Sequence, residues 1–501
     1  MDSKTNGNIR DSVFVKTYLV GLALGLILWP VAGAALAAEI AIAAFWGLQL
    51  LMLILKHVSD QAWVRLVVEF FPPLVLWILF GFGGILAILR VDGWDMYSDY
   101  DDLTVVLTTI FMLLGSYAYL LGVRIALGRD KLVWDKSKQN IAGKARILLL
   151  VILVIDWSVR FQKNLAGVYV NWIAKSGYFS AAERGTTNAL YQLQANIGMI
   201  TIPLLVYLSM EDRLKWLFRL LLVIQLTLIF LEGDRSELLM ALVIATSSYG
   251  VTRGVRVRIS VVAWGILATF IFFSVIGPII QEARIQMRRD VRVLAQEKSL
   301  MTITFAAVYL PDAVGTNIFN DNIIQDSLVK RMGAYSFYAA AIHQSMLDGK
   351  ADLLVDDFLP TVMQLVPRVL YANKGTRSSN YILQSHFKIG SVGADAHGTP
   401  VVDIFGYGYV LGIVGLMFVS GLGFGLIVKY LTKEHGLLGG LVAIGLIPVL
   451  SPMGDSFIGY LAGLRNTLIL LLIIALVDLV CTIGSSEEDA SSQSSEVLNA
   501  P

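Results

Sequence analysis

The chain has little of what a soluble protein needs. Only 15% of its 501 residues are charged, whereas soluble domains carry about 25% charged residues. Hydrophobic residues make up 56% of the chain, and the mean hydropathy is +0.69. This composition excludes an ordinary soluble enzyme or binding module and indicates a polytopic integral membrane protein.

Cysteine and net charge are also scarce. The single cysteine, Cys481, lies in the last apolar segment, which leaves no disulfide framework and no thiolate metal site. The formal net charge of +1 gives no indication of a nucleic-acid partner, since in a membrane protein the distribution of charge across the membrane matters instead, and we expect no nucleic-acid partner. A convincing signal-peptide cleavage region is missing too, and we expect the first apolar stretch to be a retained helix.

Long apolar runs are what the sequence has in abundance. Crossing the hydrocarbon takes about 20 apolar residues in a helix, and the lack of water there requires a spanning segment of this kind to be helical. We therefore predict an all-α fold, a polytopic integral membrane helix bundle of about 12 transmembrane helices. The predicted spans lie near residues 14–34, 36–55, 66–89, 104–125, 146–161, 195–211, 216–232, 236–251, 259–281, 403–428, 436–453 and 457–482.

These spans divide the chain into four parts. We expect an N-terminal transmembrane bundle over residues 1–281, a large loop over 282–402, C-terminal transmembrane helices over 403–483 and a disordered tail rich in Ser and Glu over 484–501. Within the loop, apolar helical patterns at 335–346 and 352–371 predict helices that lie flat on the membrane and wall a groove. Pro360 and Pro367 are expected to break the second helix.

Lys and Arg collect in alternate connections between the predicted spans, near residues 56–65, 124–146, 213–219, 253–258 and 429–433. Basic connections are retained on the cytoplasmic side of a membrane. Both termini are therefore predicted to be cytoplasmic, with the large loop on the opposite side. The basic run from Arg284 to Arg292 stands at the other end of the ninth span, but long loops escape this charge rule.

The large loop concentrates residues that can bind an anion. Arg284, Arg288 and Arg292 recur at every fourth position, which places their guanidinium groups on one face of a helix. Guanidinium forks bind phosphate and carboxylate. The spacing predicts a site for an anionic group such as the pyrophosphate of a lipid carrier; a solvated face, or one resting on lipid phosphates, explains it as well. The other basic candidates of the loop are Arg289, Arg368 and Arg377.

Two further arginines lie in connections on the loop side. Arg235 stands in the short turn 231–237, where four charged residues crowd the edge of the hydrocarbon. Charges at that depth are costly, so they are paired or functional. Arg235 is thus a candidate for substrate binding, or for an internal pair that holds the turn. Arg184 is a candidate for substrate binding or an ordinary surface residue, and Asp156 with Arg160 forms an i, i+4 pair expected to neutralise itself.

His397 lies just before the tenth span, at the expected membrane surface. A neutral imidazole can take a proton from a sugar hydroxyl, and Asp395 could orient it. A structural histidine is the alternative. The pair Asp99 and Asp101 has a D-x-D spacing that could hold a divalent metal through oxygen ligands, or form an acidic turn.

Several of these motifs resemble the superfamily of Wzy-type O-antigen or exopolysaccharide polymerases and O-antigen ligases. The turn Gly233-Asp234-Arg235-Ser236 is similar to the family's Gly-x-Arg-Gly/Ser, and a single large periplasmic loop is shared. The stretch from Val366 to Lys374 resembles the I-P-R-x-L-W-P-x-K pattern of polymerase loops. The run Ala396–Pro400 leading into Phe405–Gly412 looks like the family's loop exit.

The resemblance implies a GT-C-like architecture in the bacterial inner membrane and metal-independent, inverting glycosyl transfer at the periplasmic face, with no cofactor. Donor and acceptor would be oligosaccharides on undecaprenyl pyrophosphate in the bilayer, with a chain-length regulator as a further partner. By position Arg235 matches the family's pyrophosphate-binding Arg and His397 its acceptor-activating base. For the second, loop-borne Arg we favour Arg288, then Arg284, Arg292 and Arg368.

Polymerase and ligase remain open on the sequence. Gly398 follows His397 where the ligases have Asn, and Tyr371-Ala372 replaces the Trp-Pro of polymerase loops, but the Val366–Lys374 stretch as a whole favours a polymerase. Three other classes are alternatives: a transporter or flippase for a lipid-linked sugar, a metal-dependent glycosyltransferase that uses the D-x-D pair, and a scaffold for polysaccharide export. Transporters place polar groups near the midplane in broken helices, often with inverted repeats.

Overall fold

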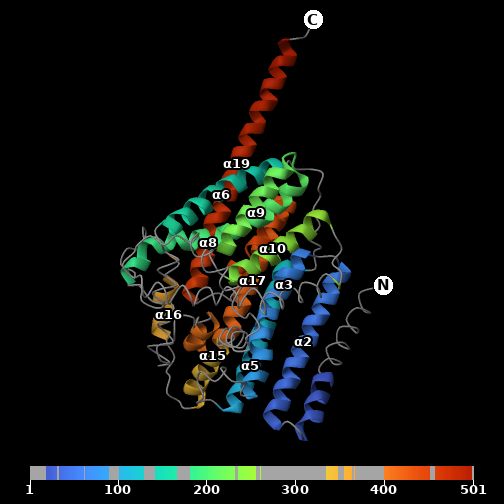
Figure 1. Ribbon diagram of the computed structural model, residues 1–501, viewed down its shortest axis with the longest axis vertical. Helices are drawn as coiled ribbons and strands as arrows, with labels where there is room; N and C mark the ends of the chain where they lie inside the picture. Colours follow the sequence, from blue (N-terminus) through green and yellow to red (C-terminus); the bar gives the residue numbers. More distant parts are fainter. Residues whose placement is uncertain are drawn as a thin grey trace, which may run out of the picture.

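The computed structural model describes residues 19–30, 33–60, 63–89, 101–128, 141–165, 181–231, 235–254, 260, 334–347, 355–363, 366, 400–451 and 457–498. Within these ranges every regular element is a helix (Figure 1). The helices are α2 (Ala34–Asp60), α3 (Trp63–Leu76), η1 (Trp77–Phe82), α4 (Gly83–Ile88), α5 (Asp102–Leu127), α6 (Ile141–Leu165), α8 (Ala181–Glu211), α9 (Lys215–Leu231), α10 (Arg235–Arg253), α15 (Ala334–Ile342), η3 (His343–Leu347), α16 (Val355–Val362), α17 (Pro400–Gly445), α18 (Ile447–Leu450) and α19 (Phe457–Leu498).

The predicted all-helical class is confirmed for this part of the chain. Five helical segments are long and apolar enough to cross a membrane: Ala34–His57, Trp63–Ile88, Asp102–Leu127, Asp403–Gly445 and Tyr460–Leu479. The other predicted spans overlap helices that are shorter or less apolar, except the span at 259–281, which lies outside the described residues apart from residue 260. The architecture is that of a helical membrane protein, and the count of about 12 spans stays a prediction.

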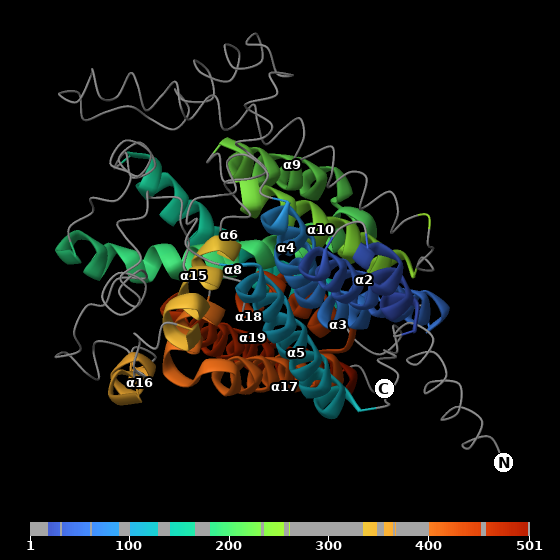
Figure 2. The same cartoon turned by 90° about the horizontal axis from the view of Figure 1, so that it is seen from below.

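Helices α5 and α17 lie side by side along much of their length (Figures 1 and 2). Their backbones approach so closely that a Cβ on Gly122 or Gly421 would come within 3.0 Å of backbone atoms of the other helix. Small residues allow such approach between apolar helices, where packing rather than water exclusion drives association. This contact joins the N-terminal spans to the C-terminal ones.

Helix α17 is bent twice. The backbone leaves the helical region at Gly408 and Tyr409, and again at Gly436, where φ is +56°. The second break lies at the start of the predicted span 436–453, and the separation of the spans 403–428 and 436–453 stays a prediction, because Asp403–Gly445 forms one apolar helical segment. The first break was not predicted. Here the segment before the break folds back against the helix that follows it. The two backbones come so close that a Cβ on Gly412 would lie 2.6 Å from the carbonyl oxygen of Ile404.

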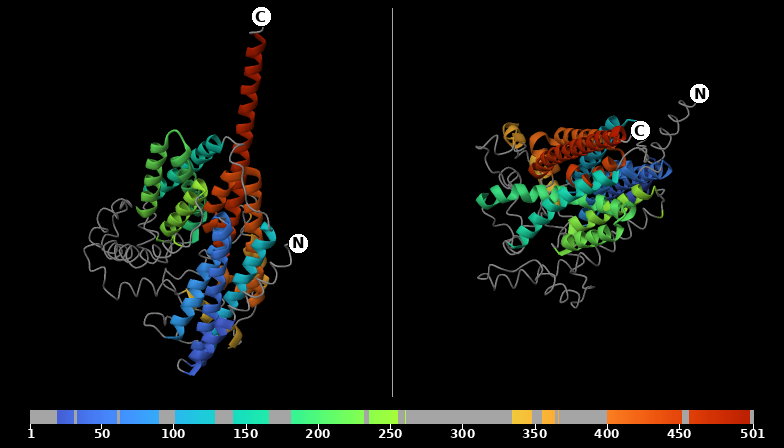
Figure 3. Two further views of the ribbon diagram at one scale, coloured as in Figure 1. Left: turned by 90° about the vertical axis from the view of Figure 1, so that its right-hand side faces the viewer. Right: turned by 90° about the horizontal axis from the view of Figure 1, so that it is seen from above.

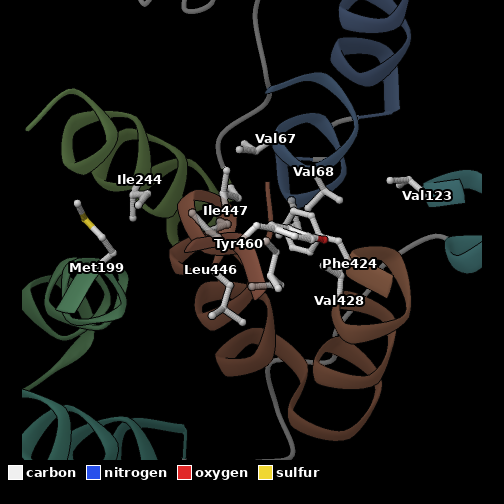
Figure 4. Close-up of a cluster of buried hydrophobic side chains, with 14 of the residues drawn as sticks. Val67, Val68, Val123, Met199, Ile244, Phe424, Val428, Leu446, Ile447 and Tyr460 are labelled. Carbon is white, nitrogen blue, oxygen red and sulfur yellow. The ribbon is translucent and has the colours of Figure 1, made fainter. Parts of the chain in front are cut away.

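The buried core draws on both halves of the chain (Figure 4). Val68 of α3, Val123 of α5, Ile244 of α10, Phe424 of α17 and Tyr460 of α19 belong to one cluster of buried side chains. The Tyr460 hydroxyl also donates to Ser420 Oγ at 2.8 Å. The parts 1–281 and 403–483 therefore share one core.

Helix α19 extends beyond the other helices as far as Leu498 (Figure 3). The structure differs here from the expected disordered tail at 484–501. Once a helix is nucleated, each further residue adds a hydrogen bond at little cost, so a polar segment can continue an apolar span.

The structure describes two helical stretches of the large loop: α15 with η3 overlaps the expected helix 335–346, and α16 covers part of the expected helix 352–371. In α15 Tyr338 is fully buried, with its ring 5.8 Å from that of Phe80 and 5.5 Å from that of Phe405. The loop is thus anchored in the bundle at this point. In α16 Pro360 lies inside the helix instead of breaking it, and Leu359 is exposed. The flat orientation of these helices on a membrane stays a prediction.

Candidate functional site

A network of buried polar side chains links α6, α8, α9 and α10. At its centre is Asp156, whose side chain is fully buried. Its carboxylate accepts hydrogen bonds from Arg160 Nε at 3.0 and 3.1 Å, from Gln194 Nε2 at 2.6 Å and from Gln225 Nε2 at 2.8 Å. Gln225 accepts in turn from Trp157 Nε1 at 2.7 Å. A buried carboxylate needs such donors to offset the loss of its hydration.

Arg160 connects this centre to the start of α10. Its side chain is 1% exposed, and its Nη2 donates to Glu237 Oε1 at 2.8 Å. Glu237 lies two residues after Arg235, the first residue of α10. The charges in the turn 231–237 were expected to be either functional or paired within the turn, and Glu237 is instead paired with Arg160 of α6. We call Asp156, Trp157, Arg160, Gln194, Gln225 and Glu237 the Arg160 network.

A glycine makes room for the network. A Cβ on Gly198 of α8 would lie 2.5 Å from Asp156 Oδ1, so a larger residue would push the carboxylate out of place. Gly198 stands one turn after Gln194, on the same face of α8. Both residues therefore serve to hold Asp156 against α8.

The predicted site residues border the described structure. Arg235 begins α10, and Arg184 lies in the first turn of α8. Their side chains lie outside the described part of the structure, as do the other candidates: His397, Asp395, Arg284, Arg288, Arg289, Arg292, Arg368 and Arg377. Their roles stay predictions.

The segment that follows His397 is well packed. Asp403, near the start of α17, is 1% exposed, and its Oδ2 accepts from the backbone N–H of Phe457 at 2.8 Å, at the start of α19. Four residues on, the Tyr407 hydroxyl lies 2.8 Å from Thr361 Oγ1 of α16. These contacts hold the exit of the large loop against the span α19 and the loop helix α16.

Tyr409 closes this segment in an unusual conformation. Its φ is 50° with ψ −137°, a region that residues with a Cβ rarely adopt and that costs about 1–3 kcal/mol. Its ring packs on Phe405 at 5.3 Å. Such outliers persist where the surroundings require them, and this one lies at the predicted loop exit.

The D-x-D pair is only partly described, because Asp99 lies outside the described residues. Asp101 caps α5: it accepts from the Thr104 hydroxyl at 2.6 Å and from the Thr104 N–H at 2.9 Å. The hydroxyl donation lowers the pKa of Asp101 below its ordinary value. The Thr104 hydroxyl also lies 3.4 Å from His343 Nδ1 of the large loop. In the described ranges no three His, Cys, Asp or Glu residues gather in a way that could hold a metal.

Basic residues at the opposite helix ends are paired. Glu69 is fully buried, with Arg65 Nε at 2.5 Å, His57 Nε2 at 3.2 Å and Arg124 Nε at 3.6 Å. Arg65 also donates to the carbonyl of Gly128 at 2.9 Å. The predicted cytoplasmic connections 56–65 and 124–146 therefore come together in space.

Two more pairs join the start of α6 to its neighbours. Asp478 of α19 accepts from Lys144 at 2.6 Å and lies 2.8 Å from His435 Nδ1 at the second bend of α17. Arg146 donates to Asp212 in the turn between α8 and α9. Burial tends to raise the pKa of Asp212, but the bonds from Arg146 and the Leu214 N–H outweigh it and lower that pKa. Ion pairs therefore connect α6, α17, α19 and the turn between α8 and α9 at this end of the bundle.

Sequence reasoning recognised the Asp156–Arg160 pair from its spacing and missed the rest of the network. Gln194, Gln225 and Trp157 carry no charge, and nothing in a single sequence says which helix faces which. A polar amide inside an apolar helix is the one signal that could have marked the two glutamines. Comparison of the chain with protein-family models, with curated proteins and with solved structures gives no match.

Proposed function

We propose that the protein is a membrane glycosyltransferase of the polysaccharide-polymerase type. It transfers a glycan from undecaprenyl pyrophosphate to a hydroxyl of a second lipid-linked repeat unit at the periplasmic face. The observation that carries the proposal is the start of α10: Arg235 opens the helix, and Glu237, one half-turn on, is held by Arg160 in a buried network.

This arrangement supports anion binding for two physical reasons. The N-terminus of a helix favours negative charge, because its free N–H groups and the helix dipole point toward the ligand. The Arg160 network fixes the first turn of α10 on three other helices, so the anion site is preorganised. Departure of a pyrophosphate develops charge that such a site stabilises, while His397 would take the acceptor proton.

A complementation assay tests the proposal. In a strain whose own copy is deleted, we would express the wild type, Arg235→Ala, Arg288→Ala or His397→Ala at equal membrane levels and separate surface and lipid-linked glycans on a gel. We expect single repeat units to accumulate on the carrier and polymer to disappear. Arg253→Ala, exposed at the far end of the same helix α10, is the matched control and should make normal polymer.

The other outcomes identify the alternatives. Full-length polymer that accumulates without reaching its final acceptor would make the protein an O-antigen ligase, which transfers glycan to lipid A-core. Unchanged glycans in all three variants would contradict a glycosyltransferase role.

A transporter or flippase is the second candidate, because ionisable groups also lie within the spans. Glu39 in α2 and Glu69 in α3 are fully buried, and α17 is broken at Tyr409 and Gly436. Buried charge and broken helices are typical of transport pathways. Uptake of a lipid-linked sugar analogue into vesicles that contain the purified protein, with no change in its glycan, would favour this candidate.

A further inference from the structure

Glu39 is buried in a different way from the other ionisable residues within the spans. It is the sixth residue of α2, inside the span Ala34–His57, and its side chain is 0% exposed. The Arg160 network does not include it, and glycosyl transfer at the loop side does not require it. An ionisable residue in a span is costly to keep and marks a function by default.

Among the described residues, one side chain hydrogen-bonds to Glu39. Thr109 Oγ1 of α5 lies 2.6 Å from Glu39 Oε1. The other carboxyl oxygen, Oε2, is buried and has no hydrogen-bond partner among the described residues. Gly84 of α4 leaves just enough room for the carboxyl, because a Cβ there would overlap Glu39 Oε1. The group is therefore enclosed by α2, α4 and α5.

The contacts of Thr109 fit a Glu39 that carries a proton, although the Phe80 carbonyl also accepts from the Gly83 N–H and the Val105 carbonyl lies 3.4 Å from Thr109 Oγ1. Its hydroxyl has one hydrogen, yet it lies 2.6 Å from Glu39 Oε1 and 3.1 Å from the carbonyl oxygen of Phe80. If Glu39 is ionised, the hydrogen goes to the carboxylate and the carbonyl receives none from it. If Glu39 is a neutral acid, its own O–H donates to Thr109 Oγ1, and Thr109 donates to Phe80. The neutral acid thus makes both bonds and avoids burying a charge.

Glu69 shows what an ionised glutamate in these helices has around it. It is equally buried, but Arg65 lies 2.5 Å away, His57 3.2 Å and Arg124 3.6 Å. No cation is paired with Glu39 among the described residues. Glu69 is thus a carboxylate balanced by neighbouring cations, whereas the carboxyl group of Glu39 has no such cation among the described residues.

The other titratable groups on the helices around Glu39 are separated from it along the helix axes. His57 is eighteen residues further along α2, about 27 Å at 1.5 Å per residue. At the start of α5, Asp101 and His343 meet at Thr104, which is five residues or about 7.5 Å from Thr109 along the axis. The groups on α2, α3, α5 and α15 are Lys56, His57, Asp60, Arg65, Glu69, Asp102, Tyr117, Tyr119, Arg124, Tyr335 and Tyr338.

We propose that Glu39 is a proton-binding site: a carboxylic acid that stays neutral at neutral pH between α2, α4 and α5 and donates its hydrogen to Thr109. The ligand is a single proton, exchanged through the loop end of the bundle, where Asp101 and His343 meet at Thr104 and Tyr338 packs on Phe80. The site is independent of the proposed glycosyl transfer and would stand if that function failed.

Infrared spectroscopy of the purified full-length protein in lipid tests the proposal. The difference between wild type and Glu39→Gln at pH 7 should contain the C=O stretching band of a protonated carboxylic acid. Glu69→Gln is the matched control, and its difference spectrum should contain carboxylate bands instead. Thr109→Val should keep the Glu39 acid band and move it to higher frequency, because the acid loses its acceptor.

Thermal unfolding gives an independent readout. Glu39→Gln replaces a neutral acid by a neutral amide of the same shape, so its midpoint should stay close to that of the wild type, whereas Glu69→Gln should unfold at a clearly lower temperature. Carboxylate bands lost in Glu39→Gln, or a drop in midpoint as large as that of Glu69→Gln, would show that Glu39 is ionised and overturn the proposal.

Discussion

Replacing Arg160 by methionine gives the sharpest test of the Arg160 network. Methionine keeps the length and the apolar stem of the side chain and removes the charge. Asp156 then loses the two hydrogen bonds from Arg160 Nε at 3.0 and 3.1 Å, and Glu237 loses its bond of 2.8 Å. Asp156 stays fully buried with only the two glutamine amides as donors.

The expected loss follows from these contacts. Removing one partner of a buried ion pair costs about 3–5 kcal/mol, because the remaining charge stays buried without compensation. Glu237 is 18% exposed and can turn toward solvent, so most of the cost arises at Asp156. We therefore expect Arg160→Met to lower the free energy of unfolding by about 3 kcal/mol.

Denaturant unfolding in mixed micelles measures this change. Arg219→Met, at an exposed position of α9, is the control and should stay within about 0.5 kcal/mol of the wild type. The double variant Asp156→Asn/Arg160→Met should recover at least half of the loss, because no uncompensated charge remains at Asp156. A loss below about 1 kcal/mol for Arg160→Met, or no recovery in the double variant, would refute the reasoning.

Three further predictions concern packing, pH and metal. Gly421→Ala should cost about 1–3 kcal/mol, because its Cβ overlaps α5, whereas Gly423→Ala on the same helix has open space and should be neutral; thermal unfolding compares them. Asp212 has a lowered pKa, so its pair with Arg146 should stabilise the fold above the ordinary Asp pKa of 3.8 and stop doing so as the pH falls below that value. Asp212→Asn should remove this part of the acid dependence of the unfolding midpoint. Glycosyl transfer by membranes treated with a chelator should continue at the untreated rate, and recovery only on adding Mg²⁺ or Mn²⁺ would favour the D-x-D alternative.

Helix positions could be predicted because long apolar runs have few alternatives in a membrane. The runs at 36–55 and 104–125 are reproduced as α2 and α5 with ends that differ by a few residues. The bend of α17 at Tyr409 was not predicted, although Gly406 and Gly408 beside it are residues that weaken a helix. That bend depends on the contact of Gly412 with Ile404 and on the packing of the loop exit.

The candidate site was predictable only where its signal is local. The spacing of Asp156 and Arg160 predicts a pair within one helix. The charged turn at Arg235 predicts that its charges are paired or functional. The pairing of Glu237 with Arg160 of α6 depends on how distant helices pack, which a single sequence does not show. Glu39 gives the opposite case: one carboxylate in an apolar run is visible in the sequence, but its lack of a cation is visible only in three dimensions.

The buried side chain of Tyr338 restricts how the large loop can move. Withdrawing an aromatic side chain of this size exposes about 150–250 Å², which corresponds to roughly 4–6 kcal/mol. Release of α15 from Phe80 and Phe405 would then occupy about one molecule in a thousand or fewer. Any movement of the large loop therefore has the docked helix α15 as its fixed point.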